Sequence, residues 1–189
     1  MSSKSFVIRT PCSSANIGPG FDVIGLALSL YLELRVTIDT AKTTSQRPLN
    51  CVITYDDQSN STEKISLDPE VNLITRVALY VLRCHDQRSF PVETCVHIVN
   101  PIPLGRGLGS SGTAVVAGVM LGNEVGQLGL SKDRLLDYCL MIGKSFSGCS
   151  STCCCSALTH GQNDIQIMLL LLYLEALLGL TSMISSLKM

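Results

Sequence analysis

The stretch from Asn100 to Gly118, NPIPLGRGLGSSGTAVVAG, constrains the fold more than any other part of the chain. Its glycines let the backbone adopt left-handed conformations and approach a ligand without a Cβ collision. Paired serines and an apolar run follow directly, which predicts a helix over residues 110–127. Backbone amides at a helix N-terminus lack intrahelical acceptors, carry partial positive charge and bind anions. The stretch therefore predicts a phosphate-binding loop that leads into a helix.

The predicted phosphate contacts are the turn residues and the first residues of the helix. The hydroxyls of Ser110 and Ser111 are also candidate Mg²⁺ ligands, since a serine hydroxyl can either donate to phosphate or coordinate the ion. The full predicted set is Pro103, Leu104, Gly105, Arg106, Gly107, Leu108, Gly109, Ser110, Ser111 and Gly112.

Two familiar glycine motifs do not describe this loop. The nucleotide-binding P-loop requires a lysine directly after its last glycine, and none is present here. Gly107, Gly109 and Gly112 match G-x-G-x-x-G, but the dinucleotide-binding version of that motif follows a strand directly, whereas two prolines intervene here. A second strand with an acidic end is also required about 20 residues later, where the sequence around Asp133 predicts a helix. A glycine turn without a ligand is the remaining structural alternative.

Hydrophobic periodicity predicts a mixed α+β domain. Alternating β-branched segments predict strands at 4–10, in the later part of 23–39, at 51–56, more weakly at 63–68, and at 94–100. Asp68 followed by Pro69 predicts the start of a helix that continues to residue 84. The helix over 110–127 follows, and Ser131 can cap another helix over 132–142. This order differs from a regular βαβ series and is typical of an α+β fold.

Composition excludes several classes of protein. With 14 basic and 15 acidic side chains, the chain lacks the positive excess of a nucleic-acid-binding protein. The N-terminal segment lacks the long apolar region of a secretory signal. Nine cysteines are an awkward number for a secreted disulfide framework. Five of them stand singly among apolar residues and are predicted to be reduced core cysteines of a cytoplasmic protein: Cys12, Cys51, Cys84, Cys95 and Cys139.

Two motifs resemble those of the GHMP kinases. PIPLGRGLGSSGTAVVAG is similar to the second motif of the family, P-x-x-x-G-L-G-S-S-[AG], which wraps the phosphates of ATP. PCSSANIGPGFDVIGLAL, from Pro11 to Leu28, resembles the first motif in its homoserine kinase form, and the resemblance extends over residues 4–142. It implies the N-terminal domain of these kinases, a ribosomal protein S5 domain 2-like α+β fold.

The resemblance implies transfer of the γ-phosphoryl group of ATP, with Mg²⁺, to the hydroxyl of L-homoserine in threonine biosynthesis. Asn16 and Asp22 match substrate-binding positions, and a carboxylate suits the ammonium group of an amino acid. Asn72 matches a position near the adenine. Each of these residues also has a structural alternative. Asn16 could be a turn residue, Asp22 a cap or a surface charge, and Asn72 a residue in the first turn of a helix. No general base is identified, and His85 and His97 are assigned no role. The family also implies a homodimer.

The character of the sequence changes after Ile142. Beyond that residue the resemblance ends, and neither the Mg²⁺-binding Glu of the family nor its H-P-D-N segment is found. We therefore predict a kinase N-terminal domain over 1–142 and a divergent Cys- and Leu-rich tail over 143–189. The C-terminal ferredoxin-like domain would then be missing, as in a frameshifted or alternatively spliced product. The corresponding functional alternative is a truncated nucleotide-binding fragment without turnover.

The tail itself supports two further interpretations. Cys149, Cys153 to Cys155 and His160 could bind zinc, although three consecutive cysteines do not suit one tetrahedral ion. The run 165–184 is nearly long enough for a membrane anchor, but the acidic Glu175 within it is costly in a bilayer. The plainer interpretation is a hydrophobic helix packed on exposed core.

Overall fold

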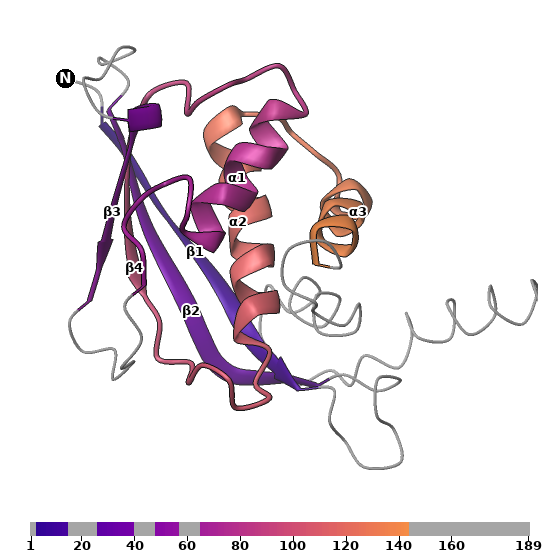
Figure 1. The fold of residues 1–189 in the computed structure, drawn as a ribbon. Coiled ribbons are helices and arrows are strands. Elements are labelled where there is room, and N and C mark those ends of the chain that lie inside the picture. The colour runs from indigo at the N-terminus through magenta and orange to yellow at the C-terminus, as the bar shows by residue number, and fades with distance from the viewer. Residues whose placement is uncertain (1–2, 15–25, 40–47, 57–64, 144–189) are drawn as a thin grey trace, which may run out of the picture.

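A four-stranded sheet with helices on one face forms the described part of the computed structural model, which covers residues 3–14, 26–39, 48–56 and 65–143 (Figure 1). The strands lie in the order β1-β2-β4-β3. The elements in chain order are β1 (Ser3–Ser14), β2 (Leu26–Asp39), the short 3-10 helix η2 (Pro48–Asn50), β3 (Cys51–Tyr55), α1 (Leu73–Arg83), β4 (Glu93–Val99), α2 (Ser110–Gly126) and α3 (Lys132–Ile142).

The central strand β2 shows why these residues form a sheet. Its alternating Leu32, Leu34, Val36 and Ile38 are buried beneath the helices, while the residues between them face the opposite side. β2 pairs antiparallel with both β1 and β4, and β3 pairs parallel with β4. β1 is longer than the predicted 4–10 segment and continues past a register shift after Pro11, which has no N–H to donate to the ladder.

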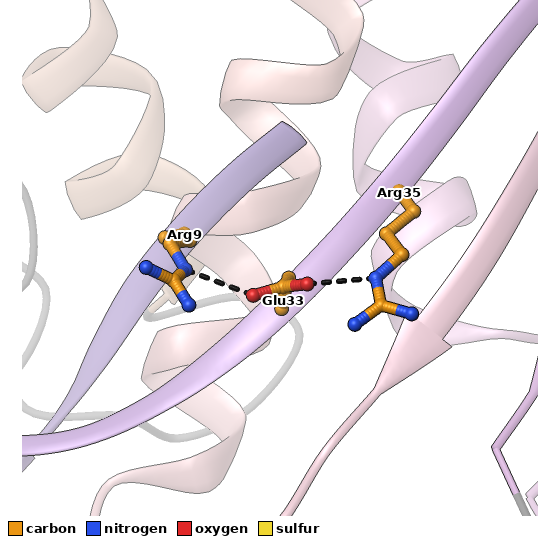
Figure 2. A network of polar contacts seen from close by, with 3 residues as sticks. All are labelled: Arg9, Glu33 and Arg35. Carbon is orange, nitrogen blue, oxygen red and sulfur yellow. Dashed lines mark hydrogen bonds and ion pairs between the residues drawn. The ribbon is translucent and has the colours of Figure 1, made fainter. Parts of the chain in front are cut away.

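The sheet face away from the helices carries a charged network from two neighbouring strands (Figure 2). Glu33 accepts hydrogen bonds from the Nε atoms of Arg35 and Arg9, each at 2.8 Å. The hydrogen bonds from Arg35 and Arg9 hold the pKa of the Glu33 carboxyl below its ordinary value. Both arginine side chains are more than half exposed, so this network contributes little to folding stability.

Helices α1 and α2 lie side by side over the other face of the sheet, and α3 lies beyond them (Figure 1). Buried residues of α1, α2 and β2 form the main core, with Phe90 among its largest side chains. A second cluster joins Tyr138, Cys139 and Ile142 of α3 to valines of α1 and α2. Because α2 is packed by the sheet, by α1 and by α3, its sequence is apolar nearly all round.

Two local predictions about the segment before α1 were wrong. Residues 65–68, the described part of the predicted weak strand, belong to no strand. The helix begins at Leu73 with Asn72 as its N-cap, and the predicted start at Asp68 is a separate turn. In that turn the Oδ1 of Asp68 accepts from the Glu70 amide at 2.9 Å. The helices over 110–127 and 132–142 are confirmed to within one residue, as is the strand over 94–100.

None of the five single cysteines forms a disulfide, but the prediction that all belong to the core was wrong for two of them. Cys12, Cys51 and Cys139 are buried. Cys84 and Cys95 are exposed, because Cys84 directly follows the last residue of α1 and Cys95 alternates onto the open face of the sheet. The clustered cysteines and the apolar run of the tail lie outside the described residues. None of the described helices is both long and apolar enough to cross a membrane.

We expect the buried Cys51 thiol to make the fold lose stability above pH 9. Burial raises its pKa from 9.0 to about 12, with a smaller contribution from Cys95. A raised folded-state pKa means that the unfolded chain loses the proton first as the pH rises. The contribution of the protonated Cys51 thiol to the free energy of unfolding is therefore complete below pH 9. It is lost as the pH rises from the unfolded-state pKa of 9.0 to the folded-state pKa of about 12, by about 1.4 kcal/mol per pH unit.

Urea unfolding of the wild type and of Cys51→Ala between pH 8.5 and 10.5 isolates this contribution, because other groups titrate equally in both proteins. The wild type should lose stability more steeply with pH than the variant. Equal slopes in the wild type and Cys51→Ala would contradict the prediction.

Candidate active site

The glycine loop leaves the end of β4 through an ordered turn. The Oδ1 atom of Asn100 accepts from the Ile102 amide at 3.1 Å. Ile102 is 3% exposed and anchors the start of the loop in the core. The following Gly105, Arg106 and Gly107 are exposed. The chain therefore leaves the sheet in a fixed direction and then presents a bare backbone to solvent.

Gly109 is the point at which the loop contacts the sheet. It has φ +61° and is the N-cap of α2. A Cβ at this position would lie 2.6 Å from the Oγ of Ser13 and 2.8 Å from its carbonyl oxygen. The Ser13 amide also donates to the carbonyl of Leu108 at 3.2 Å. Glycine is therefore required here both by the left-handed backbone and by the close approach of β1.

Thr113 fixes the first turn of α2 to the same strand. Its buried hydroxyl lies 3.1 Å from the carbonyl oxygen of Pro11 and 3.0 Å from that of Gly109, and its amide donates to the Gly109 carbonyl at 2.9 Å. No functional role was predicted for Thr113 or Ser13. Neither contact has a local signal in the sequence, because the residues that meet are about a hundred positions apart.

The N-terminus of α2 is arranged to bind an anion. Among the described residues, no side chain caps this end of the 17-residue helix. The amides of Ser110, Ser111 and Gly112 have no intrahelical acceptors, and the helix dipole adds partial positive charge. Both serines are partly exposed. Arg106 is the one charged side chain between residues 100 and 112, so no carboxylate within the loop opposes an anion.

The predicted adenine residue, Asn72, has a structural role that the sequence analysis weighed as its alternative. It is 3% exposed and caps α1, with its Oδ1 accepting from the Ile74 amide at 3.1 Å. Its Nδ2 donates to the hydroxyl oxygen of Tyr55 at 2.8 Å and to the carbonyl of Ser66 at 2.9 Å. Both amide hydrogens of Asn72 are therefore used within the protein.

Asn72 lies on the side of the domain toward which the glycine loop faces, but beside the middle of α2, because Ile74 lies against Gly118. Gly118 lies against Ile74 and Val77, and Gly126 lies against Leu82, so α1 and α2 run in the same direction. Their N-termini consequently point the same way (Figure 1). The parallel strands β3 and β4 also end on this side, where ligands commonly bind in sheets with parallel strands.

The remaining candidate residues are placed elsewhere or not described. Asn16 and Asp22 lie outside the described residues. His85 lies just beyond the C-terminus of α1, with Nε2 3.2 Å from the Tyr138 hydroxyl. His97 lies on β4, with Nδ1 2.9 Å from the Thr54 hydroxyl.

In the described ranges, no group of three or more His, Cys, Asp or Glu side chains could hold a metal ion. Mg²⁺ binding through serine hydroxyls stays a prediction.

Comparison with known proteins identifies the domain. Residues 72–161 match the family model described as "GHMP kinases N terminal domain". Residues 72–161 therefore belong to a GHMP kinase N-terminal domain. The predicted boundary at residue 142 lies within the matched range and stays a prediction.

Several curated relatives of this GHMP kinase domain are named homoserine kinase. That of Saccharomyces cerevisiae is 62% identical over 141 residues, which cover 74% of this chain and 40% of the relative. Those of Candida albicans and Schizosaccharomyces pombe are 56% and 52% identical over similar lengths, and 39% of each relative is covered. The chain therefore spans about 40% of the length of the curated relatives it matches.

Solved structures confirm the predicted fold class of the GHMP kinase domain. A homoserine kinase from Cytophaga hutchinsonii has a TM-score of 0.63 at 23% identity, covering 82% of this chain and 46% of that one. The mevalonate kinase of Methanococcus jannaschii has a TM-score of 0.63 at 17% identity, covering 84% and 52%. At these identities the likeness concerns the fold.

Proposed function

We propose that this protein takes part in homoserine phosphorylation, transferring the γ-phosphoryl group of ATP to the hydroxyl of L-homoserine. The observation that carries the proposal is the uncapped N-terminus of α2 behind the glycine loop, within a domain up to 62% identical to homoserine kinases. The exposed loop amides and Arg106 would neutralise phosphate charge. Phosphoryl transfer depends mainly on positioning and on charge neutralisation, so the mechanism does not require a strong general base.

The proposed division of roles follows from the chemistry of the ligands. The loop from Pro103 to Gly112 would hold the triphosphate, and the hydroxyls of Ser110 and Ser111 would approach the Mg²⁺ that accompanies it. Asn16 and Asp22 would bind the amino acid, with the carboxylate of Asp22 opposite its ammonium group. Mg²⁺ would supply positive charge that offsets the charge of the phosphates. A homodimer and a cytoplasmic location remain parts of the proposal.

We expect the purified 189-residue chain to release ADP from Mg-ATP in a manner that depends on L-homoserine. ADP release is measured with and without homoserine, with L-threonine as a control hydroxyl substrate, and ATP binding is measured separately by calorimetry. Homoserine-dependent release supports the proposed reaction. Binding of ATP without such release would instead favour the predicted alternative, nucleotide binding without turnover. A folded chain that binds no ATP would overturn both.

A further inference from the structure

The hydroxyl of Tyr55 is a hydrogen-bond donor beside the candidate site that no predicted role uses. Its oxygen accepts from the Nδ2 of Asn72 at 2.8 Å. The second Nδ2 hydrogen of Asn72 goes to the carbonyl of Ser66, and its Oδ1 caps the Ile74 amide. These contacts fix the orientation of the amide, because the carbonyl of Ser66 requires a donor and the amide of Ile74 requires an acceptor.

The same contacts leave the Tyr55 hydrogen available. A phenol both donates and accepts, and here the oxygen already accepts, so its hydrogen is directed away from Asn72. Within the described part of the chain, this hydrogen has no acceptor. Burial also raises the pKa of the Tyr55 hydroxyl, so the group keeps its proton at neutral pH. Asn72, by contrast, has no donor left for a ligand.

Tyr55 lies on a strand that pairs with the strand leading into the glycine loop. It is the last residue of β3 and pairs with Ile98, next to the end of β4. The loop begins two residues after Ile98, at Asn100. A nucleotide whose phosphates lie on the N-terminus of α2 must place its base somewhere on this side of the domain. The cluster of Tyr55, Asn72 and Ser66 is a polar group on that side, between the ends of the parallel strands and the start of α1.

We propose that the Tyr55 hydroxyl donates a hydrogen bond to a ring nitrogen of the bound nucleobase. Asn72 is then a positioning residue, because it holds the phenol oxygen and so directs its hydrogen. This assignment rests on the proposed nucleotide-binding function and adds a residue that selects the base. It also makes the predicted adenine-binding role of Asn72 an indirect one.

Tyr55→Phe tests the assignment, because it removes the hydroxyl and keeps the ring. Binding of ATP, of inorganic tripolyphosphate and of 1-deaza-, 3-deaza- and 7-deaza-ATP is measured by calorimetry on the full chain. The variant should bind ATP about tenfold more weakly and tripolyphosphate unchanged, as expected for one lost hydrogen bond. One deaza analogue, which lacks the accepting nitrogen, should bind wild type and variant equally. Tyr138→Phe also removes a hydrogen-bonded tyrosine hydroxyl but lies on α3, and should leave all affinities unchanged.

The outcomes separate this assignment from the function on which it rests. Unchanged ATP affinity in Tyr55→Phe would overturn it, and so would an equal loss for tripolyphosphate or for all three analogues. Should the variant not fold, the wild type still tests for a ring-nitrogen contact, because one analogue must bind about tenfold more weakly than ATP, and equal binding of ATP and all three analogues overturns the assignment. Wild type that binds tripolyphosphate and ATP equally overturns the base contact only. Wild type that binds neither overturns the proposed function as well.

Discussion

Gly109→Ala should lower the free energy of unfolding by about 3 kcal/mol and abolish measurable ATP binding. The left-handed backbone at φ +61° costs any residue with a Cβ about 1–2 kcal/mol. The new methyl group would also lie 2.6 Å from the Oγ of Ser13 and 2.8 Å from its backbone oxygen. Overpacking against backbone adds about 1–3 kcal/mol. The loop must then move away from β1, so the amides at the start of α2 lose their arrangement. Urea unfolding and calorimetry with ATP measure the two effects.

Gly105→Ala separates backbone strain from the collision. Gly105 also has positive φ, at +67°, but a Cβ there would meet nothing within 4 Å. This variant should therefore show only the strain, about 1–2 kcal/mol of lost stability. Equal destabilisation by the two substitutions would show that contact with Ser13 does not fix the loop, and would contradict the explanation given for Gly109.

Gly118→Ala should be among the most destabilising single-methyl substitutions, at about 3 kcal/mol. Gly118 lies where α2 packs against α1, and a Cβ there would lie 2.5 Å from the carbonyl oxygen of Ile74 and 2.8 Å from the Cβ of Val77. Neither atom can rotate away, so the helices must separate. The gain in helix propensity from glycine to alanine, about 1 kcal/mol, offsets only part of this cost. Chemical denaturation measures the result.

Gly126→Ala in the same helix is the matched control. A Cβ at Gly126 would lie 2.6 Å from the Cδ2 of Leu82, the end of a flexible side chain. Rotation of that side chain relieves the contact, so we expect destabilisation of less than about 1 kcal/mol. If Gly118→Ala were as mild as Gly126→Ala, the close approach of α1 and α2 would not be a determinant of stability.

The segments that were predicted correctly are those whose signals are local. Ser131 precedes its helix, and in the structure its Oγ accepts from the Arg134 amide, three residues later, at 3.4 Å. The glycines of the loop likewise have positive φ, as their density suggested. Local signals fail where two of them compete. Asp68 and Asn72 are both helix-capping residues, and the buried contacts of Asn72 with Tyr55 and Ser66 decide that the helix begins at the second.

By itself, the sequence determined the glycine loop, the helix behind it, the mixed α+β class and the family resemblance, because these depend on neighbouring residues. Only the tertiary structure decided what the loop rests on and which donors remain free. The Thr113 hydroxyl donates a hydrogen bond to the carbonyl of Pro11 across a separation of 102 residues. The Tyr55 hydroxyl accepts one from the side-chain amide of Asn72, 17 residues away. Such contacts depend on the packing of the helices on the sheet, and no short segment of the sequence encodes them.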